Sequence, residues 1–146
     1  MSNLEIRVVS YPEAEKPIRI IRTKVFQEEQ KVDPKLEFDG KDESCQHLLA
    51  YFDCEAVGTA RIRCINNFQA KIERLAVLPF ARRKGVGKQL MEKALNFIAE
   101  KGYQVVEINA QIYVKDLYSK LGFTPVGEEF LEAGMPHLKM IKKLDN

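Results

Sequence analysis

The stretch "ERLAVLPFARRKGVGKQLM", residues 73–91, decides how the chain folds around it. Its first part resembles a strand, and Pro79 ends that pattern. Arg82, Arg83 and Lys84 then lead into Gly85 and Gly87, and apolar residues recur at helical spacing from position 86 onward. The stretch therefore predicts a strand, a basic glycine turn and a helix in direct succession.

A turn of this kind can hold an anion. The first N–H groups of a helix have no intrahelical partners, and the helix dipole adds partial positive charge at that end. Gly85 and Gly87 let the backbone approach a ligand closely. These features favour a phosphate cradle, although basic residues also occur at strand–helix turns that bind nothing.

Two common phosphate motifs do not match the turn. A P-loop needs glycine and Ser or Thr at positions that hold Arg82 and Gln89 here. A dinucleotide-binding fingerprint needs a small residue where the chain has Leu90, and its strand would normally open the fold. The residues of the turn alone leave the phosphate ligand open.

Working outward, apolar patterning predicts the remaining elements. We expect strands at 5–9, 45–52, 56–65, 70–78 and 104–110, with two more around a turn at 132–135. Helices are expected within 11–30, over 86–101 and over 114–121, and the acidic segment 31–44 is expected to be a loop. The unit 70–110 should be a right-handed parallel crossover. The fold class is therefore α/β, with a mixed and mostly antiparallel sheet flanked by helices.

Composition narrows the class of protein. The 146 residues suit one domain, 1–146, and the net charge of +2 argues against a nucleic-acid surface. The three cysteines have neither disulfide-framework nor zinc spacing, and no metal-binding constellation is visible. No leader-like start or apolar run of about 20 residues is present, so we expect a cytoplasmic protein that does not bind membranes.

Two motifs resemble those of a known family. The residues Leu75, Val77, Pro79, Arg82, Gly85 and Gly87 match motif A of the GNAT superfamily of N-acetyltransferases in register. The stretch "LYSKLGF" (117–123) resembles motif B, and the element order is similar across the whole chain. Segments such as "EFDGKD" and "GMPHLKM" look like the small ElaA-like branch. The segment "RTKVFQEEQ" also loosely resembles acyl-homoserine-lactone synthases.

The resemblance implies that acetyl-CoA is the co-substrate. Its pyrophosphate would bind the turn, its pantetheine arm would pair with the strand at 75–77, and the Val77 N–H would face the thioester carbonyl. Gln111 stands where many members have asparagine. The implied coenzyme-binding residues are Leu75, Ala76, Val77, Arg82, Arg83, Lys84, Gly85, Val86, Gly87, Lys88, Gln111 and Tyr118.

Three residues are candidates for catalysis. Tyr118 could protonate the leaving thiolate or only pack beneath the coenzyme. Glu73 is a candidate base because regular strand alternation would place it on one face with Leu75 and Val77, unless a cation pairs with it. His137 is an alternative base, because an imidazole titrates near neutral pH, but a lone histidine is also often structural.

The other polar residues suggest structural roles. We expect His47 to satisfy a hydrogen bond in the core and the carboxylates of segment 31–44 to be solvated, unless they attract a cationic amine. The predicted function is direct acetyl transfer to an unidentified amine in a ternary complex. The alternative is a non-catalytic acyl-CoA-binding sensor or interaction module. An edge strand of the last hairpin could pair two subunits into a homodimer.

Overall fold

The computed structural model describes residues 3–144, which form a seven-stranded sheet in the order β1-β2-β3-β4-β5-β7-β6. All neighbours are antiparallel except β4 and β5, which are parallel. This confirms the predicted mixed sheet with one parallel crossover. The strands are β1 Leu4–Ser10, β2 Gln46–Phe52, β3 Glu55–Cys64, β4 Gln69–Val77, β5 Val105–Gln111, β6 Thr124–Glu132 and β7 Met135–Lys143.

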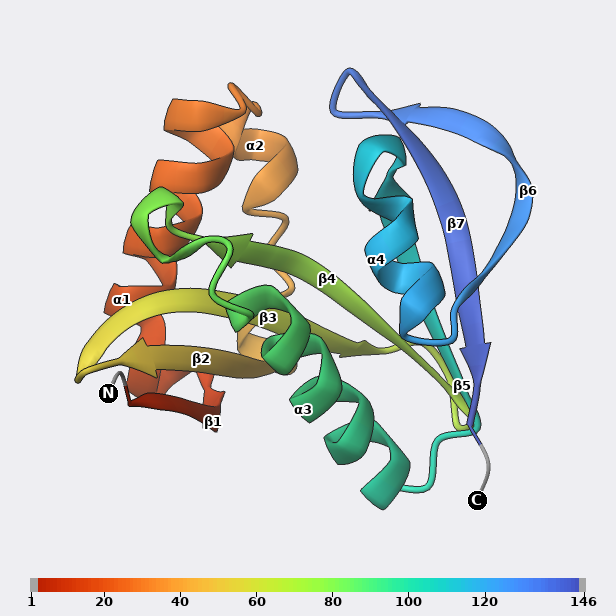
Figure 1. Ribbon diagram of the computed structural model, residues 1–146, viewed down its shortest axis with the longest axis horizontal. Helices are drawn as coiled ribbons and strands as arrows, with labels where there is room; N and C mark the ends of the chain where they lie inside the picture. Colours follow the sequence, from red (N-terminus) through yellow and green to blue (C-terminus); the bar gives the residue numbers. More distant parts are fainter. Residues whose placement is uncertain (1–2, 145–146) are drawn as a thin grey trace.

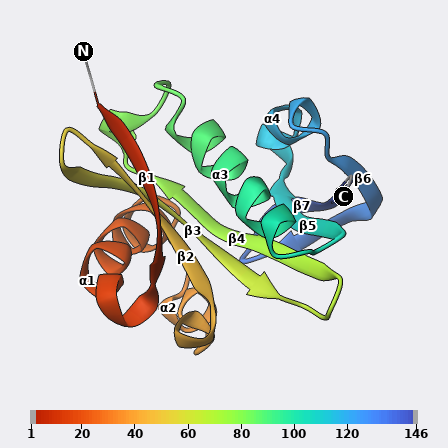
Figure 2. The ribbon, with the colours of Figure 1, turned by 90° about the horizontal axis from the view of Figure 1, so that it is seen from below.

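Helices cover both faces of the sheet. Helices α1 and α2 lie on one face, and α3 and α4 lie on the other (Figures 1 and 2). The α-helices are α1 Tyr11–Arg22, α2 Pro34–Glu37, α3 Val86–Glu100 and α4 Lys115–Lys120. A π-helical segment, η1 Thr23–Glu29, extends α1, and short 3-10 turns are η2 Asp42–Ser44, η3 Pro79–Ala81 and η4 Ile112–Val114.

The apolar core has two parts, one on each face. Leu90 on α3 and Leu48 on β2 are fully buried in one part, whereas Ile18 on α1 and Leu49 on β2 are fully buried in the other. Gly58 on β3 lets α3 lie close to the sheet, since a Cβ there would be 3.0 Å from the Leu90 side chain. The first turn of α3 is thereby held directly over β3 and β4.

Segment 31–44 differs from the expected solvated loop. It contains α2 and η2, and its carboxylates Glu37 and Asp42 are buried. The fully buried guanidinium groups of Arg22 and Arg61 hold them: Arg22 pairs with Glu37 and Asp42, and Arg61 pairs with Asp42 and Asp39. Two buried arginines require carboxylate partners of this kind. The sequence pattern of a charged loop does not show that its carboxylates will be buried.

A bulge in β4 changes which residues face the site. Arg74 has a φ of 56°, and the register with β3 shifts at this point. Before the bulge, Glu73 faces the α1 side, where Arg61 binds it; after the bulge, Leu75 packs on the α3 side. The expectation that Glu73 shares a face with Leu75 and Val77 is therefore wrong, because the extra residue reverses the alternation.

Candidate active site between two diverging strands

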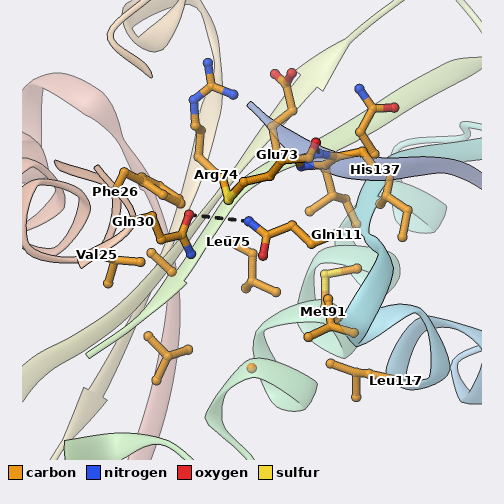
Figure 3. A pocket seen from close by; sticks show the side chains of 18 of the residues that line it. Val25, Phe26, Gln30, Glu73, Arg74, Leu75, Met91, Gln111, Leu117 and His137 are labelled. Atoms are coloured by element: carbon orange, nitrogen blue, oxygen red, sulfur yellow. Dashed lines mark hydrogen bonds between the residues drawn. The ribbon is translucent and has the colours of Figure 1, made fainter. Parts of the chain in front are cut away.

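The site lies where β4 and β5 separate. The two strands pair only from Gln69–Val105 to Lys71–Glu107 and then diverge (Figure 1). A cavity of about 930 Å³ opens in the gap, and η1, β4, α3, α4 and β7 contribute to its walls (Figure 3). The sequence-predicted residues that line it are Glu73, Leu75, Ala76, Val77, Arg82, Arg83, Gly85, Val86, Gly87, Lys88, Gln111, Tyr118 and His137.

One predicted coenzyme-binding residue lies away from this cavity. Lys84 is exposed, and its ammonium group lies 5.3 Å from the centre of the Phe52 ring. The lining of the cavity does not include it. The expected contact of Lys84 with the coenzyme therefore has no support in the geometry.

The glycine turn forms the predicted cradle of N–H groups. Gly85 is the N-cap of α3 with a φ of 79°, a left-handed conformation that glycine adopts without strain. The Gln89 N–H donates to the Gly85 carbonyl at 3.0 Å. Within residues 3–144, the N–H groups of Val86, Gly87 and Lys88 have no main-chain acceptor. All three residues line the cavity, and N–H groups at a helix N-terminus can bind an anion.

Arg82 connects this cradle with η1. Its Nε donates to the Val77 carbonyl at 2.9 Å, and its two terminal nitrogens donate to the Glu29 carboxylate at 2.6 and 2.5 Å. This pairing raises the pKa of Arg82 and lowers the pKa of Glu29, chiefly through the hydrogen bonds. The charge of Arg82 is therefore already compensated, whereas Arg83 and Lys88 are exposed at the rim.

The end of β4 presents an N–H group to the gap. The Leu78 N–H donates to the Val57 carbonyl on β3 at 2.8 Å. Because successive peptide groups of a strand point to opposite sides, the Val77 N–H faces away from β3 and into the gap. On the far side, the Gln111 Nε2 donates to the Gln30 Oε1 at 3.3 Å, which links β5 to η1 (Figure 3).

Tyr118 on α4 is a buried phenol that lines the cavity. Its ring packs edge-on against Phe123, with 6.2 Å between the ring centres. Burial raises the pKa of Tyr118 to about 12, so the hydroxyl stays protonated over the physiological range. Such a group donates a hydrogen bond readily but releases its proton reluctantly.

The carboxylate of Glu73 is held by cations. It accepts hydrogen bonds from Arg61 and Arg63, each at 2.8 Å, and Lys71 lies 3.6 Å away. Burial alone would raise its pKa, but these hydrogen bonds and charges outweigh burial and lower the pKa to about 2. A carboxylate of such low basicity is poorly suited to remove a proton from an amine.

His137 on β7 is better placed to act as a base. It is buried, and its Nδ1 lies 2.8 Å from the Met135 carbonyl. A carbonyl only accepts hydrogen bonds, so Nδ1 carries the proton and Nε2 has the lone pair in the neutral ring. The Glu132 carboxylate lies 3.6 Å from Nε2.

Sequence reasoning missed several residues of the cavity. Glu29 and Gln30 reach it from the end of η1, Arg74 reaches it from the bulge, and Asn109 and Glu132 lie beside His137. No local pattern marks these five residues, because contacts between segments far apart in the sequence bring them together. His47 was predicted to make a core hydrogen bond, and this is confirmed: its Nε2 lies 2.8 Å from the Asp42 carbonyl.

Across residues 3–144, no helix is long and apolar enough to cross a membrane. In the same residues, no group of three or more His, Cys, Asp or Glu side chains is arranged to hold a metal ion. An anion cradle and ionisable groups in one cavity define a site suited to group transfer.

Comparison with known proteins places the chain in a family. A family model described as acetyltransferase (GNAT) domain matches residues 10–144, so the chain belongs to the GNAT acetyltransferases. The chain is 38% identical to YyaT of Bacillus subtilis, over 85% of each chain. It is 32% identical to ElaA of Escherichia coli, over 85% of this chain and 84% of ElaA.

Solved structures agree with this assignment. The ElaA crystal structure from Escherichia coli has a TM-score of 0.84 at 28% identity, over 96% of this chain and 99% of ElaA. An acyl-CoA N-acyltransferase from Pseudomonas aeruginosa has a TM-score of 0.83 at 30% identity, with the same shares covered. A GNAT acetyltransferase from Elizabethkingia anophelis, solved with acetyl-CoA bound, shares the fold: TM-score 0.75, 20% identity, 97% of this chain and 99% of that one.

Proposed function

We propose that this protein transfers the acetyl group of acetyl-CoA to a primary amine by direct attack in a ternary complex. One observation carries the proposal: a single cavity joins the N–H cradle of α3 to the buried Tyr118 and His137. Membership of the GNAT family supports acyl transfer in general. The donor, the acceptor class and the residue roles are our inference from the geometry.

The cavity suits acetyl-CoA at its cradle end. The N–H groups of Val86, Gly87 and Lys88 would bind the pyrophosphate, with Arg83 at the rim. The pantetheine arm would follow the exposed edge of β4, where β5 has moved away. The GNAT acetyltransferase of the same fold that was solved with acetyl-CoA bound supports this choice of donor.

Acetyl-CoA supplies an activated thioester carbonyl, and the residues of the cavity supply the rest. The Val77 N–H would stabilise negative charge on the carbonyl oxygen, and His137 Nε2 would accept a proton from the amine. As the N–C bond forms and the C–S bond breaks, the attacking nitrogen loses one proton and the sulfur gains one. The proton that an ammonium ion first gives to His137 is released to solvent. Tyr118 would donate a hydrogen bond to the sulfur, because its high pKa disfavours full proton transfer.

We place this activity in the cytoplasm and expect no metal requirement. Strand β6 is an edge of the sheet, and its side chains are mostly exposed. It offers unpaired main-chain groups to a second copy, so a homodimer is the assembly that we propose to test by light scattering. The active-site residues named here all come from one chain, and the proposed chemistry does not depend on the dimer.

Calorimetric titration with acetyl-CoA tests the proposal, with ATP and NAD as controls. We expect one acetyl-CoA per chain and much weaker binding of the controls. Replacing both Arg82 and Arg83 by alanine should weaken acetyl-CoA binding about tenfold, because each can contribute a charge-assisted hydrogen bond to phosphate. Lys93→Ala, an exposed change further along α3, is the matched control. Equal binding of all three ligands would refute the coenzyme assignment.

A further inference from the structure

Apart from Arg83 and Lys88 at the cradle end, the charged groups that line the cavity contact opposite charges, except at one place. Glu73 is bound by Arg61 and Arg63, and Glu37 is bound by Arg22. Arg74 donates to Asp39, and Arg82 pairs with Glu29. In contrast, Glu132 has no Lys or Arg partner among residues 3–144, and its sole ion-pair contact is His137. The acceptor end of the cavity thus carries one unpaired negative charge, beyond the cradle.

Glu132 and His137 form a pair of hydrogen-bond acceptors. In the neutral ring His137 Nε2 has its lone pair, and the Glu132 Oε2 lies 3.6 Å from it. No proton lies between two acceptors of this kind, and the distance exceeds that of a hydrogen bond. One –NH3⁺ group can donate to both at once, which neither a hydroxyl nor a carboxylate can do.

Asn109 on β5 fixes the carboxylate of this pair. Its Nδ2 donates to the Glu132 Oε1 at 3.1 Å, and the orientation of the amide follows because a carboxylate only accepts. The Asn109 Oδ1 is buried and has no hydrogen-bond partner within residues 3–144.

Apolar side chains line other parts of the cavity. Phe26 and Val32 come from η1 and the segment after it, Leu36 from α2, and Met135 from the start of β7. Leu36 is 58% exposed, so it forms part of the entrance to the cavity. Among residues 3–144, Arg74 and Arg82 of the lining each already contact a carboxylate, and Glu132 is the one lining carboxylate without a Lys or Arg partner.

We propose that the Glu132–His137–Asn109 cluster binds the ammonium group of the acceptor, and that the acceptor is a primary monoamine with an apolar, uncharged body. This substrate class rests on the proposed acetyl transfer to an amine. Glu132 would attract the cation, and His137 Nε2 would take its proton before attack. Asn109 is a positioning residue, because it acts through the carboxylate of Glu132.

Acetyl-CoA turnover is measured, by release of free thiol, with three kinds of amine at equal concentration. Phenethylamine and hexylamine represent monoamines with apolar bodies, spermidine represents polyamines, and glutamate represents amino acids. We expect the monoamines to have at least tenfold higher kcat/KM than the other two. A preference for spermidine or glutamate would overturn the proposed class.

Two variants test the cluster itself. Glu132→Gln should raise the KM for phenethylamine about tenfold, with little change in kcat and unchanged affinity for acetyl-CoA. Glu129→Gln, an exposed carboxylate on the same strand outside the cavity, should leave all three values unchanged. An unchanged KM in Glu132→Gln would refute the ammonium site.

The two proposals fail in different ways. Loss of acetyl-CoA binding in the wild-type protein would remove the proposed function and this inference together. Normal acetyl-CoA binding, with turnover of glutamate but not of phenethylamine, would keep the function and reject the inference. Asn109→Leu provides a second check: it should raise the KM for phenethylamine while acetyl-CoA affinity is retained, and an unchanged KM would remove Asn109 from the site.

Discussion

Two glutamates of the cavity, Glu73 and Glu132, have opposite surroundings. Glu73 is buried among Arg61, Arg63 and Lys71, whereas Glu132 faces the buried ring of His137 and is half-exposed. The first arrangement lowers the basicity of the carboxylate and links strands, and the second leaves a charge available to a ligand. The structural role therefore belongs to Glu73, and the proposed substrate role belongs to Glu132.

Glu73→Gln should lower stability at neutral pH. The pKa of Glu73 is about 2 in the fold against an ordinary value of 4.5. A lowered pKa contributes stability above about 4.5, and this contribution is lost as the pH falls toward 2; it amounts to about 3 kcal/mol. Urea unfolding at pH 7 and pH 3 measures the difference between wild type and variant. A difference that does not shrink at the lower pH would contradict the ion-pair account.

Tyr118→Phe should lower kcat about tenfold, the effect of removing one hydrogen bond to a charged group, and leave acetyl-CoA affinity unchanged. Because the pKa of Tyr118 is about 12, its hydroxyl stays protonated from pH 6 to pH 10. The ratio of wild-type to variant kcat should therefore be constant across this range. A ratio that changes with pH would mean that the phenol itself titrates. Tyr113→Phe, at a position 77% exposed on the rim, is the control.

At the residue scale, the sequence identified most of the predicted residues that line the cavity, but it did not predict how each side chain is oriented. Motif spacing identified Tyr118 and the glycine turn, and both line the cavity. Glu73 also lines it, yet the bulge at Arg74 turns its carboxylate toward Arg61. A bulge with a non-glycine residue at positive φ has no reliable local signal, so strand alternation alone gave the wrong face.

At the element scale, η1 is the part of the fold that contacts both sides of the coenzyme gap. Its last residue, Glu29, pairs with Arg82 beside the cradle, and the following Gln30 bonds to Gln111 at the end of β5. A π-helical segment is uncommon and often occurs at functional sites. These two bridges hold η1 against the groove that the coenzyme arm enters in the proposed complex.

Glu29→Gln should therefore strengthen acetyl-CoA binding. The Glu29 carboxylate competes with phosphate for the Arg82 guanidinium, and both side chains are about 40% exposed, at 41% and 38%. A partly exposed pair of this kind contributes little, so we expect about threefold tighter binding by calorimetry. Glu28→Gln, an exposed neighbour outside the cavity, should have no effect. Weaker binding in Glu29→Gln would show that the pair organises the cradle instead.

The elements that could be predicted are those with a regular apolar period. The helix at 86–101 and the strands at 45–52 and 56–65 were predicted correctly, as α3, β2 and β3. Segment 31–44 could not be predicted, because long-range ion pairs to Arg22 and Arg61 stabilise it rather than a local apolar pattern. These buried ion pairs form only when the folded sheet has brought the partner side chains together.

At the scale of the whole molecule, the gap between β4 and β5, where we propose that the coenzyme binds, is an interruption in the sheet. Strands β4 and β5 pair at only three positions, and the main-chain groups of β4 beyond Lys71 have no partner on β5. A ligand that pairs with this edge would join the two halves of the sheet. Ligand binding to the folded state alone also stabilises the fold by mass action.

Thermal unfolding with and without acetyl-CoA measures this coupling. At a concentration of about 100 times Kd, the ligand should add about 2.7 kcal/mol of stability. For a chain of this size, that corresponds to a rise in Tm of roughly 5–10 °C. ATP at the same concentration should give a smaller rise, because it can occupy the cradle but has no arm to pair with β4. Equal shifts for the two ligands would mean that only the cradle is used, and the edge of β4 would then have no role in binding.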